Sequence, residues 1–213
     1  MRMKKIFISL LVLVSIMTIS VLAQNAEKLP PIKVKEYQLK NGLRVVLHQD
    51  RSTPVVAVNV WYHVGSKNEE AGRTGFAHLF EHMMFQGSKN YNNDYFTPLQ
   101  EAGGNINGTT NQDRTYYYET VPSNFLELAL FLEADRLGGL LEAMTQEKLD
   151  NQRDVVKNER RQRVDNQPYG TTFEKIGEIM YPKGHPYNWT TIGSLEDLQA
   201  ASMEDVKSFF RQY

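Results

Sequence analysis

The chain has 213 residues, of which 41% are hydrophobic, 11% aromatic and 23% charged, and its formal net charge is −1. These proportions are those of an ordinary globular protein. The chain has no cysteine, which excludes a disulfide scaffold, a thiolate zinc finger and a cysteine nucleophile. Since basic side chains are not in excess, little is available to neutralise phosphates, and we expect no nucleic-acid partner.

The first 23 residues have the features of an export signal. Basic side chains near the start precede an apolar run from Ile6, and the small residue Ala23 stands at a cleavage position. We therefore expect a signal peptide over residues 1–23, a linker over 24–32 and a folded region over 33–213. The alternative is a retained membrane anchor, because the apolar run approaches the length of a membrane span. An exported protein without cysteine favours the bacterial periplasm or cell envelope, with secretion as the alternative.

Strand patterns come first in the body of the chain. Two short runs, Val34 to Leu39 and Leu43 to His48, flank an Asn-Gly dipeptide that is typical of tight hairpin turns. The run from Pro54 to Val64 is rich in valine and aromatic residues, which predicts a buried strand. Farther along, Asn105 to Thr110 and Asp113 to Thr120 predict another strand pair.

Helical spacing of apolar residues predicts the remaining elements. One helix is expected within Gly72 to Phe85 and another from about Thr145 to Arg163. After Pro122, we expect Ser123 to cap a long helix that buries one apolar face. The residues expected on that face are Leu126, Leu130, Phe131 and Leu137. Shorter helices are predicted over Thr172 to Met180, Ser194 to Ala200 and Ser202 to Tyr213.

Two histidines and a glutamate in the first predicted helix form the most informative motif. His78 and His82 are four residues apart, so both imidazoles lie on one helix face, with Glu81 beside them. Neutral imidazoles and a carboxylate suit Zn²⁺ when no thiolate is available. The order His-x-x-Glu-His is the inverted zinc motif. The simpler alternative is an amphipathic helix whose histidines are ordinary hydrogen-bonded polar groups. The histidines His48 and His63 lie in strand patterns and are expected to be structural or exposed.

The surroundings of this motif resemble the pitrilysin–insulinase family of zinc metallopeptidases over nearly the whole exported part. The resemblance rests on Gly65-Ser66, Glu69, Gly75 to Gly87, Gly103 to Thr109, Asp113 to Tyr116 and His185 to Gly193. It implies an α+β fold in which helices cover a largely antiparallel sheet, as in domains of the pitrilysin and mitochondrial-processing-peptidase type. Because family members continue beyond Tyr213, we expect the C-terminal part of this architecture to be absent.

The same resemblance implies roles for individual residues. His78 and His82 would bind one zinc ion, and Glu81 would be the general base. In the family a distant glutamate completes the site, and Glu159, 77 residues after His82, occupies that place. Family members usually carry a second glutamate seven residues before this ligand, where this chain has Gln152. Gln152 shares the helix face of Glu159 and is expected to hydrogen-bond near the site without supplying negative charge.

The segment from Gly103 to Thr110 resembles the sheet edge to which the family's substrates add as an extra strand. Backbone hydrogen bonding of this kind tolerates many sequences. The resemblance therefore implies short or unfolded polypeptides as substrates, with Gly104, Asn105 and Asn107 as substrate-binding residues. For Asn107, holding a turn or strand end is the alternative.

Two classes of function remain open at this point. The first is a zinc-dependent endopeptidase that needs a homologous partner subunit, a dimer or the missing C-terminal domain. The second is an inactive fragment, or a non-catalytic subunit that binds a peptide or a partner. The intact residues His78, Glu81, His82 and Glu159 favour the first class, whereas Gln152 and the early end favour the second. Membrane contact is expected only through the signal or anchor segment.

Overall fold

The computed structural model describes residues 31–213, so the expected signal peptide and most of the expected linker lie outside the described residues. The chain separates into two compact units, one up to Thr53 and one from Pro54 to Tyr213. Within residues 31–213, no helix combines the length and the apolar character needed to cross a membrane.

The first unit contains the predicted hairpin. Strand β1 (Val34–Gln38) pairs with the antiparallel strand β2 (Arg44–His48). Gly42 has a φ of +92°, which a residue with a side chain rarely adopts, and Asn41 Oδ1 accepts a 3.2 Å hydrogen bond from the backbone N–H of Leu43. The Asn-Gly dipeptide therefore makes the turn that its sequence predicts.

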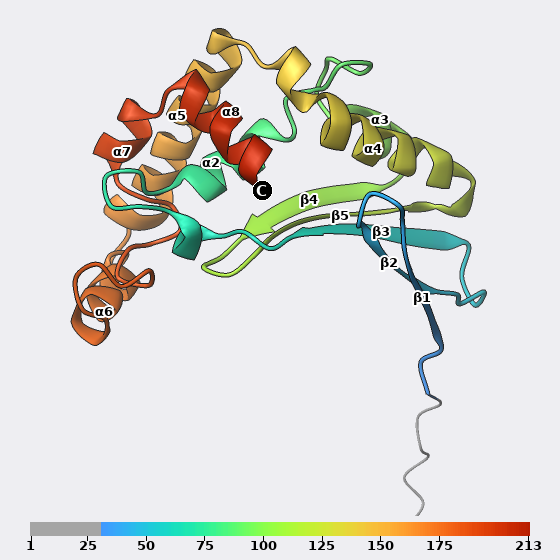
Figure 1. The fold of residues 1–213 in the computed structure, drawn as a ribbon, viewed down its shortest axis with the longest axis horizontal. Coiled ribbons are helices and arrows are strands. Elements are labelled where there is room, and N and C mark those ends of the chain that lie inside the picture. Colours follow the sequence, from blue (N-terminus) through green and yellow to red (C-terminus); the bar gives the residue numbers. More distant parts are fainter. Residues whose placement is uncertain (1–30) are drawn as a thin grey trace, which may run out of the picture. The chain divides into compact units, whose positions relative to one another are not determined.

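The second unit is built on a three-stranded antiparallel sheet with the order β3-β5-β4. The strands are β3 (Val55–Tyr62), β4 (Asn105–Thr110) and β5 (Thr115–Pro122). Helices cover one face of this sheet (Figure 1). Along β5, Tyr117 is buried while its neighbours Tyr116 and Tyr118 are partly exposed, which is the alternation expected when one face is covered.

The second unit has seven α-helices, six of which correspond to helices predicted from the sequence. They are α2 (Phe76–Met83), α3 (Phe96–Glu101), α4 (Leu126–Ala143), α5 (Gln146–Arg160), α6 (Thr172–Met180), α7 (Leu195–Ala200) and α8 (Met203–Gln212). A five-residue π-helical turn, Arg161–Asp165, continues α5. The short helix α3 and the 3₁₀ turn Ser66–Asn68 are not predicted from the sequence.

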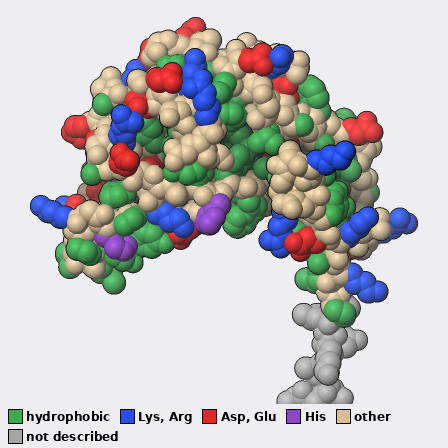
Figure 2. Space-filling view, in the orientation of Figure 1, with side chains coloured by type: hydrophobic (Ala, Val, Ile, Leu, Met, Phe, Trp, Pro, Cys, Tyr) green, Lys and Arg blue, Asp and Glu red, His purple; other side chains and the backbone are tan. Residues whose placement is uncertain are grey.

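Helix α2 lies between two clusters of buried apolar side chains. Phe80 and Met84 belong to a cluster shared with the sheet and with α3 and α4, whereas Leu79 and Met83 belong to a cluster shared with α5, α7 and α8. On the surface of the second unit, hydrophobic side chains gather below the helices, and acidic and basic side chains are interspersed over them (Figure 2). Packing on both sides fixes α2, which makes it a rigid platform for polar groups.

The predicted buried face of α4 is wrong. Leu130, Phe131 and Leu137 are 50%, 47% and 40% exposed, and Ser123 does not cap the helix but begins a 3₁₀ turn, Ser123–Phe125. The buried side of α4 carries polar residues as well as apolar ones: Ala129, Leu132, Glu133, Asp135, Arg136, Gly139, Leu140 and Ala143. An apolar pattern cannot reveal a helix face that buries charged groups.

The buried charges of α4 meet a carboxyl group of the sheet. Arg136 is fully buried, forms a two-pronged ion pair with Glu133, and lies 4.2 Å from the centroid of the Tyr117 ring. Glu119 on β5 is 1% exposed, and neither of its oxygens has a hydrogen-bond partner among the described residues. Burial and the nearby Glu133 carboxylate raise the pKa of Glu119 to about 9, so this carboxyl group is neutral at neutral pH.

Replacing Glu119 by glutamine is expected to flatten the dependence of stability on pH. The folded chain keeps the Glu119 proton above pH 4.5, where the unfolded chain loses it. The resulting stabilisation is complete below that pH and is lost as the pH rises towards 9, by about 1 kcal/mol per pH unit. Urea unfolding across this range should show a smaller loss for Glu119→Gln, whose amide stays neutral. Equal slopes for both proteins would contradict a protonated Glu119.

Candidate metal centre

The start of α2 is held by a buried carboxylate. Glu69 Oε2 accepts a 3.0 Å hydrogen bond from the N–H of Gly75, and its Oε1 accepts one of 2.8 Å from the N–H of Ala77. These donors belong to the first turn, whose N–H groups have no partner within the helix. Gly75 has a φ of +85°, and a Cβ atom there would lie 2.7 Å from the carbonyl oxygen of Ile192. The glycine and Glu69 therefore fix where α2 begins, and with it the positions of the histidines.

Three side chains from α2 and α5 converge as the sequence predicts. Nε2 of His82 lies 3.3 Å from Oε2 of Glu159, and Nε2 of His78 lies 3.8 Å from the same oxygen. One donor atom from each of the three residues lies within 4.8 Å of the others. Among residues 31–213, this is the one cluster of histidine, aspartate and glutamate side chains with the spacing of a metal site.

The protonation states of these groups suit a cation. Burial, together with the neighbouring His82, lowers the pKa of His78 to about 4, so its imidazole is neutral at neutral pH. Contact with the His82 side chain lowers the pKa of Glu159, which is therefore a carboxylate. Arg163 also lies 2.6 Å from Oε1 of Glu159, the oxygen that does not face the histidines. A neutral imidazole and an ionised carboxylate are the forms that ligate metals.

Helix α5 presents Glu159 and Gln152 on one face, two turns apart. Leu149 and Val156 on that face are fully buried against α2, so the helix cannot turn its polar residues away from the histidines. Nδ1 of His82 lies 3.3 Å from Oε1 of Gln152, and a hydrogen on Nδ1 leaves the Nε2 lone pair free for a metal. Gln152 thus makes the predicted hydrogen bond beside the cluster, and it is a bond to His82.

Glu81 lies beside the three donors in a buried position. Its Oε2 accepts a 2.5 Å hydrogen bond from Oγ1 of Thr110 on β4. Burial raises the pKa of Glu81, and the hydrogen bond from Thr110 opposes that rise. A carboxyl group with a raised pKa accepts a proton more readily than an ordinary one, as a general base must.

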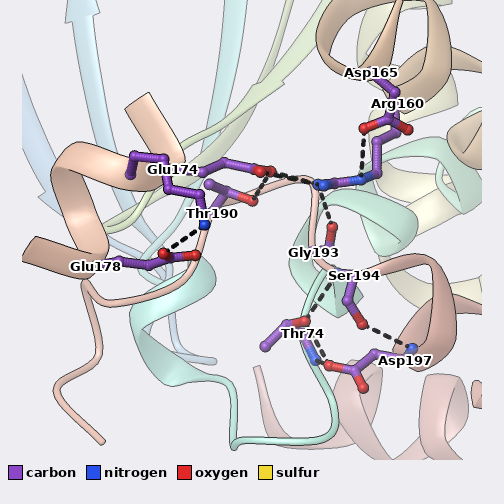
Figure 3. A network of polar contacts seen from close by, with 10 residues as sticks. Thr74, Arg160, Asp165, Glu174, Glu178, Thr190, Gly193, Ser194 and Asp197 are labelled. Carbon is purple, nitrogen blue, oxygen red and sulfur yellow. Dashed lines mark hydrogen bonds and ion pairs between the residues drawn. The ribbon is translucent and has the colours of Figure 1, made fainter. Parts of the chain in front are cut away.

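A polar network connects the two helices that carry the donor residues (Figure 3). Arg160, the residue after Glu159, donates hydrogen bonds of 2.6 Å to Glu174 on α6 and 2.8 Å to the carbonyl oxygen of Gly193. The following residue, Ser194, donates its N–H to Oγ1 of Thr74, just before α2. The end of α5 is therefore connected to the start of α2 through the segment between α6 and α7.

The donors line an open cavity of about 460 Å³ between α2, α5 and β4. Asn107 is part of its lining, together with Gly108 and Thr109 of the same strand. Gly104 and Asn105 lie nearer the start of β4 and are not among the lining residues, so the substrate-binding role of these residues stays a prediction. Thr110 and Phe85 also line the cavity. Neither is predicted from the sequence, because their roles depend on how the strand meets the helix.

The other three histidines make different contacts. His63 is exposed, and Nδ1 of His48, in the first unit, lies 2.9 Å from the carbonyl oxygen of Lys33. The ring of His185 stacks on Tyr181, with 4.7 Å between the ring centroids. Among the described residues, none of these three histidines belongs to the donor set.

The donor set fits zinc. Two imidazole nitrogens and one carboxylate oxygen are the ligands of many catalytic zinc sites, which keep a fourth position open. Nδ1 of His78 is buried without a hydrogen-bond partner among the described residues, so Nε2 is the nitrogen of that ring that faces a polar group. His78, His82 and Glu159 are thus the residues that would hold the ion.

Known proteins share this sequence and fold. Residues 44–191 match the family Insulinase (Peptidase family M16). The zinc protease PqqE of Helicobacter pylori is 36% identical over 183 residues, which are 85% of this chain and 40% of that protein. A protease structure from Helicobacter pylori matches with a TM-score of 0.80 and 35% identity, over 85% of this chain and 44% of that one. For the crystal structure of pitrilysin the TM-score is 0.76 with 25% identity, over 88% and 20% of the two chains.

The chain thus spans less than half the length of each of these relatives. Its fold, helices over an antiparallel sheet, is the fold that the resemblance implies. The family match covers more than half of the chain. The three convergent donors, His78, His82 and Glu159, all lie within it. The chain belongs to the insulinase family of peptidases, peptidase family M16.

Proposed function

We propose that this protein is a zinc-dependent endopeptidase that hydrolyses short or unfolded polypeptides. The observation that carries the proposal is the convergence of His78, His82 and Glu159 beside the buried carboxyl group of Glu81 in one open cavity. Zinc-protease relatives support the metal, and we propose one zinc ion per chain.

Each residue has a distinct chemical role in this proposal. His78, His82 and Glu159 hold the ion, which when bound supplies the Lewis acidity that polarises a carbonyl group and acidifies water. Glu81 takes a proton from the attacking water and then gives it to the nitrogen of the leaving amine, so the carboxylate is restored at the end of the cycle. Gln152 keeps His82 oriented through the contact with Nδ1.

The outer edge of β4 is the proposed substrate edge. Among the strands of the second unit β4 pairs only with β5, so its other backbone edge is open to an extended peptide. Asn107 lines the cavity and is exposed, which supports contact with a substrate main chain. We propose the same role for Asn105, the first residue of this strand, and for Gly104, which precedes it. Recognition through backbone groups would accept many sequences.

The proposed setting of the protein is the bacterial cell envelope or periplasm, after export directed by residues 1–23. Because the chain covers less than half of its relatives, we propose that activity requires the rest of that architecture, supplied by a homologous partner subunit or a further domain. The alternative is a subunit that binds a peptide or a partner without turnover. Gln152 favours this alternative, since it adds no negative charge beside the metal.

Zinc content and peptide cleavage measured on the same sample test the proposal. We expect one zinc ion per chain and cleavage of a quenched fluorogenic peptide without stable structure. A chelator should abolish cleavage, and added zinc should restore it. Zinc binding without cleavage would support the non-catalytic alternative, and absence of zinc binding would contradict the metal site itself.

A further inference from the structure

Two residues of β4 meet Glu81 from the sheet. A Cβ atom on Gly108 would lie 3.1 Å from Cγ of Glu81 and 3.1 Å from the ring of Phe85, so a larger residue would press on both side chains. Two residues farther on, and so on the same face of the strand, Thr110 donates its 2.5 Å hydrogen bond to Oε2 of Glu81. The strand thus fixes one oxygen of a carboxyl group that lines the cavity.

The hydroxyl group of Thr115 can accept a hydrogen bond from the Thr110 hydroxyl group but cannot donate one to it. Oγ1 of Thr115 donates its single proton to the carbonyl oxygen of Val64 over 2.9 Å, because a carbonyl group can only accept. The lone pairs of the same oxygen are left for Thr110, whose Oγ1 lies 3.2 Å away. The Thr110 proton therefore has two acceptors within reach, the carboxylate of Glu81 and the hydroxyl of Thr115.

Of these two acceptors the carboxylate is the nearer, at 2.5 Å against 3.2 Å, so Thr110 donates to Oε2 of Glu81. This hydrogen bond occupies Oε2 and leaves Oε1 as the oxygen that takes a proton from water and gives it to the leaving amine. Because Oε2 can accept from Thr110 throughout, the carboxyl group need not move during the proton transfers.

We propose that Thr110 is the positioning residue for the general base Glu81. This inference rests on the proposed function. A general base acts only within hydrogen-bond reach of the proton that it takes, and small displacements of a reacting group cost much of the rate. A hydroxyl group that holds Oε2 of the base in place meets that requirement.

Three substitutions of threonine test this role. Thr110→Val keeps the side-chain shape and removes the hydroxyl group, Thr110→Ser keeps the hydroxyl group, and Thr120→Val is a matched control on the exposed face of β5. We expect Thr110→Val to lower kcat about 10- to 100-fold with KM and zinc content unchanged. Thr110→Ser should restore kcat to within about threefold of the original. Equal losses for valine and serine, or a change confined to KM, would overturn the proposal.

A double-mutant cycle separates this proposal from the proposed function. Unfolding by urea of the zinc-loaded protein is compared for Glu81→Met, Thr110→Val and the double variant. We expect the two positions to be coupled, by about tenfold in the unfolding equilibrium constant. Additive effects would overturn the positioning role whatever the activity. Coupling in a protein that hydrolyses no peptide would support the contact and overturn the peptidase.

Discussion

Glu81→Gln is expected to abolish peptide hydrolysis while zinc stays bound. The amide has nearly the shape of the carboxyl group and can still accept the hydrogen bond from Thr110, but it cannot take a proton from water. Loss of a general base lowers the rate by about 10²- to 10⁴-fold. Since Glu81 is not one of the three convergent donors, zinc content should remain that of the unsubstituted protein.

The control for this variant is Glu101→Gln, which makes the same chemical change at an exposed position at the end of α3. It should retain full activity and zinc content. Cleavage of a quenched peptide and elemental analysis of zinc are measured for both variants. Full hydrolysis by a pure, zinc-loaded Glu81→Gln sample would remove Glu81 from the mechanism.

How far the sequence predicts this site depends on how local each contact is. His78, Glu81 and His82 share one turn of a helix, so their spacing alone places them together. Glu159 is 77 residues away and is predicted only through the family resemblance. Thr110 reaches Glu81 because β4 pairs with β5 in one particular register, in which Thr110 lies opposite Thr115. The spacing of residues along the chain does not predict that register.

The fold shows the same division between local and distant determinants. The hairpin turn at Gly42 and the helix over Thr172–Met180 follow from local residue preferences, and both are confirmed. Helix α3 is six residues long and contains Pro98, which leaves too few positions to establish a helical period. The orientation of α4 depends on Arg136 and Glu133, which are buried beside Glu119 of the sheet. A buried polar cluster of this kind can be recognised only once the partners are known.

Removing the proposed third ligand, Glu159, is expected to have the largest effect on metal affinity. Glu159→Gln replaces an ionised carboxylate with a neutral amide, which is a poor zinc ligand, at the position where Nε2 of His82 lies 3.3 Å away. Loss of a group that only supports a ligand typically weakens metal binding 10- to 100-fold, so we expect Glu159→Gln to raise the Kd for zinc by about 100-fold or more. Competition with a chelating dye measures this directly.

Two further variants of α5 make this result specific. Glu147→Gln, exposed in the first turn, makes the same change far from the histidines and should leave the Kd for zinc unaltered. Gln152→Ala removes the partner of Nδ1 of His82 and should weaken binding by about tenfold. We therefore expect the highest Kd for zinc in Glu159→Gln and an intermediate Kd in Gln152→Ala. Glu147→Gln and the original chain should share the lowest Kd. Because α5 is also packed through Leu149 and Val156, all three variants should stay folded, so an unchanged Kd in Glu159→Gln would mean that this carboxylate is not a ligand.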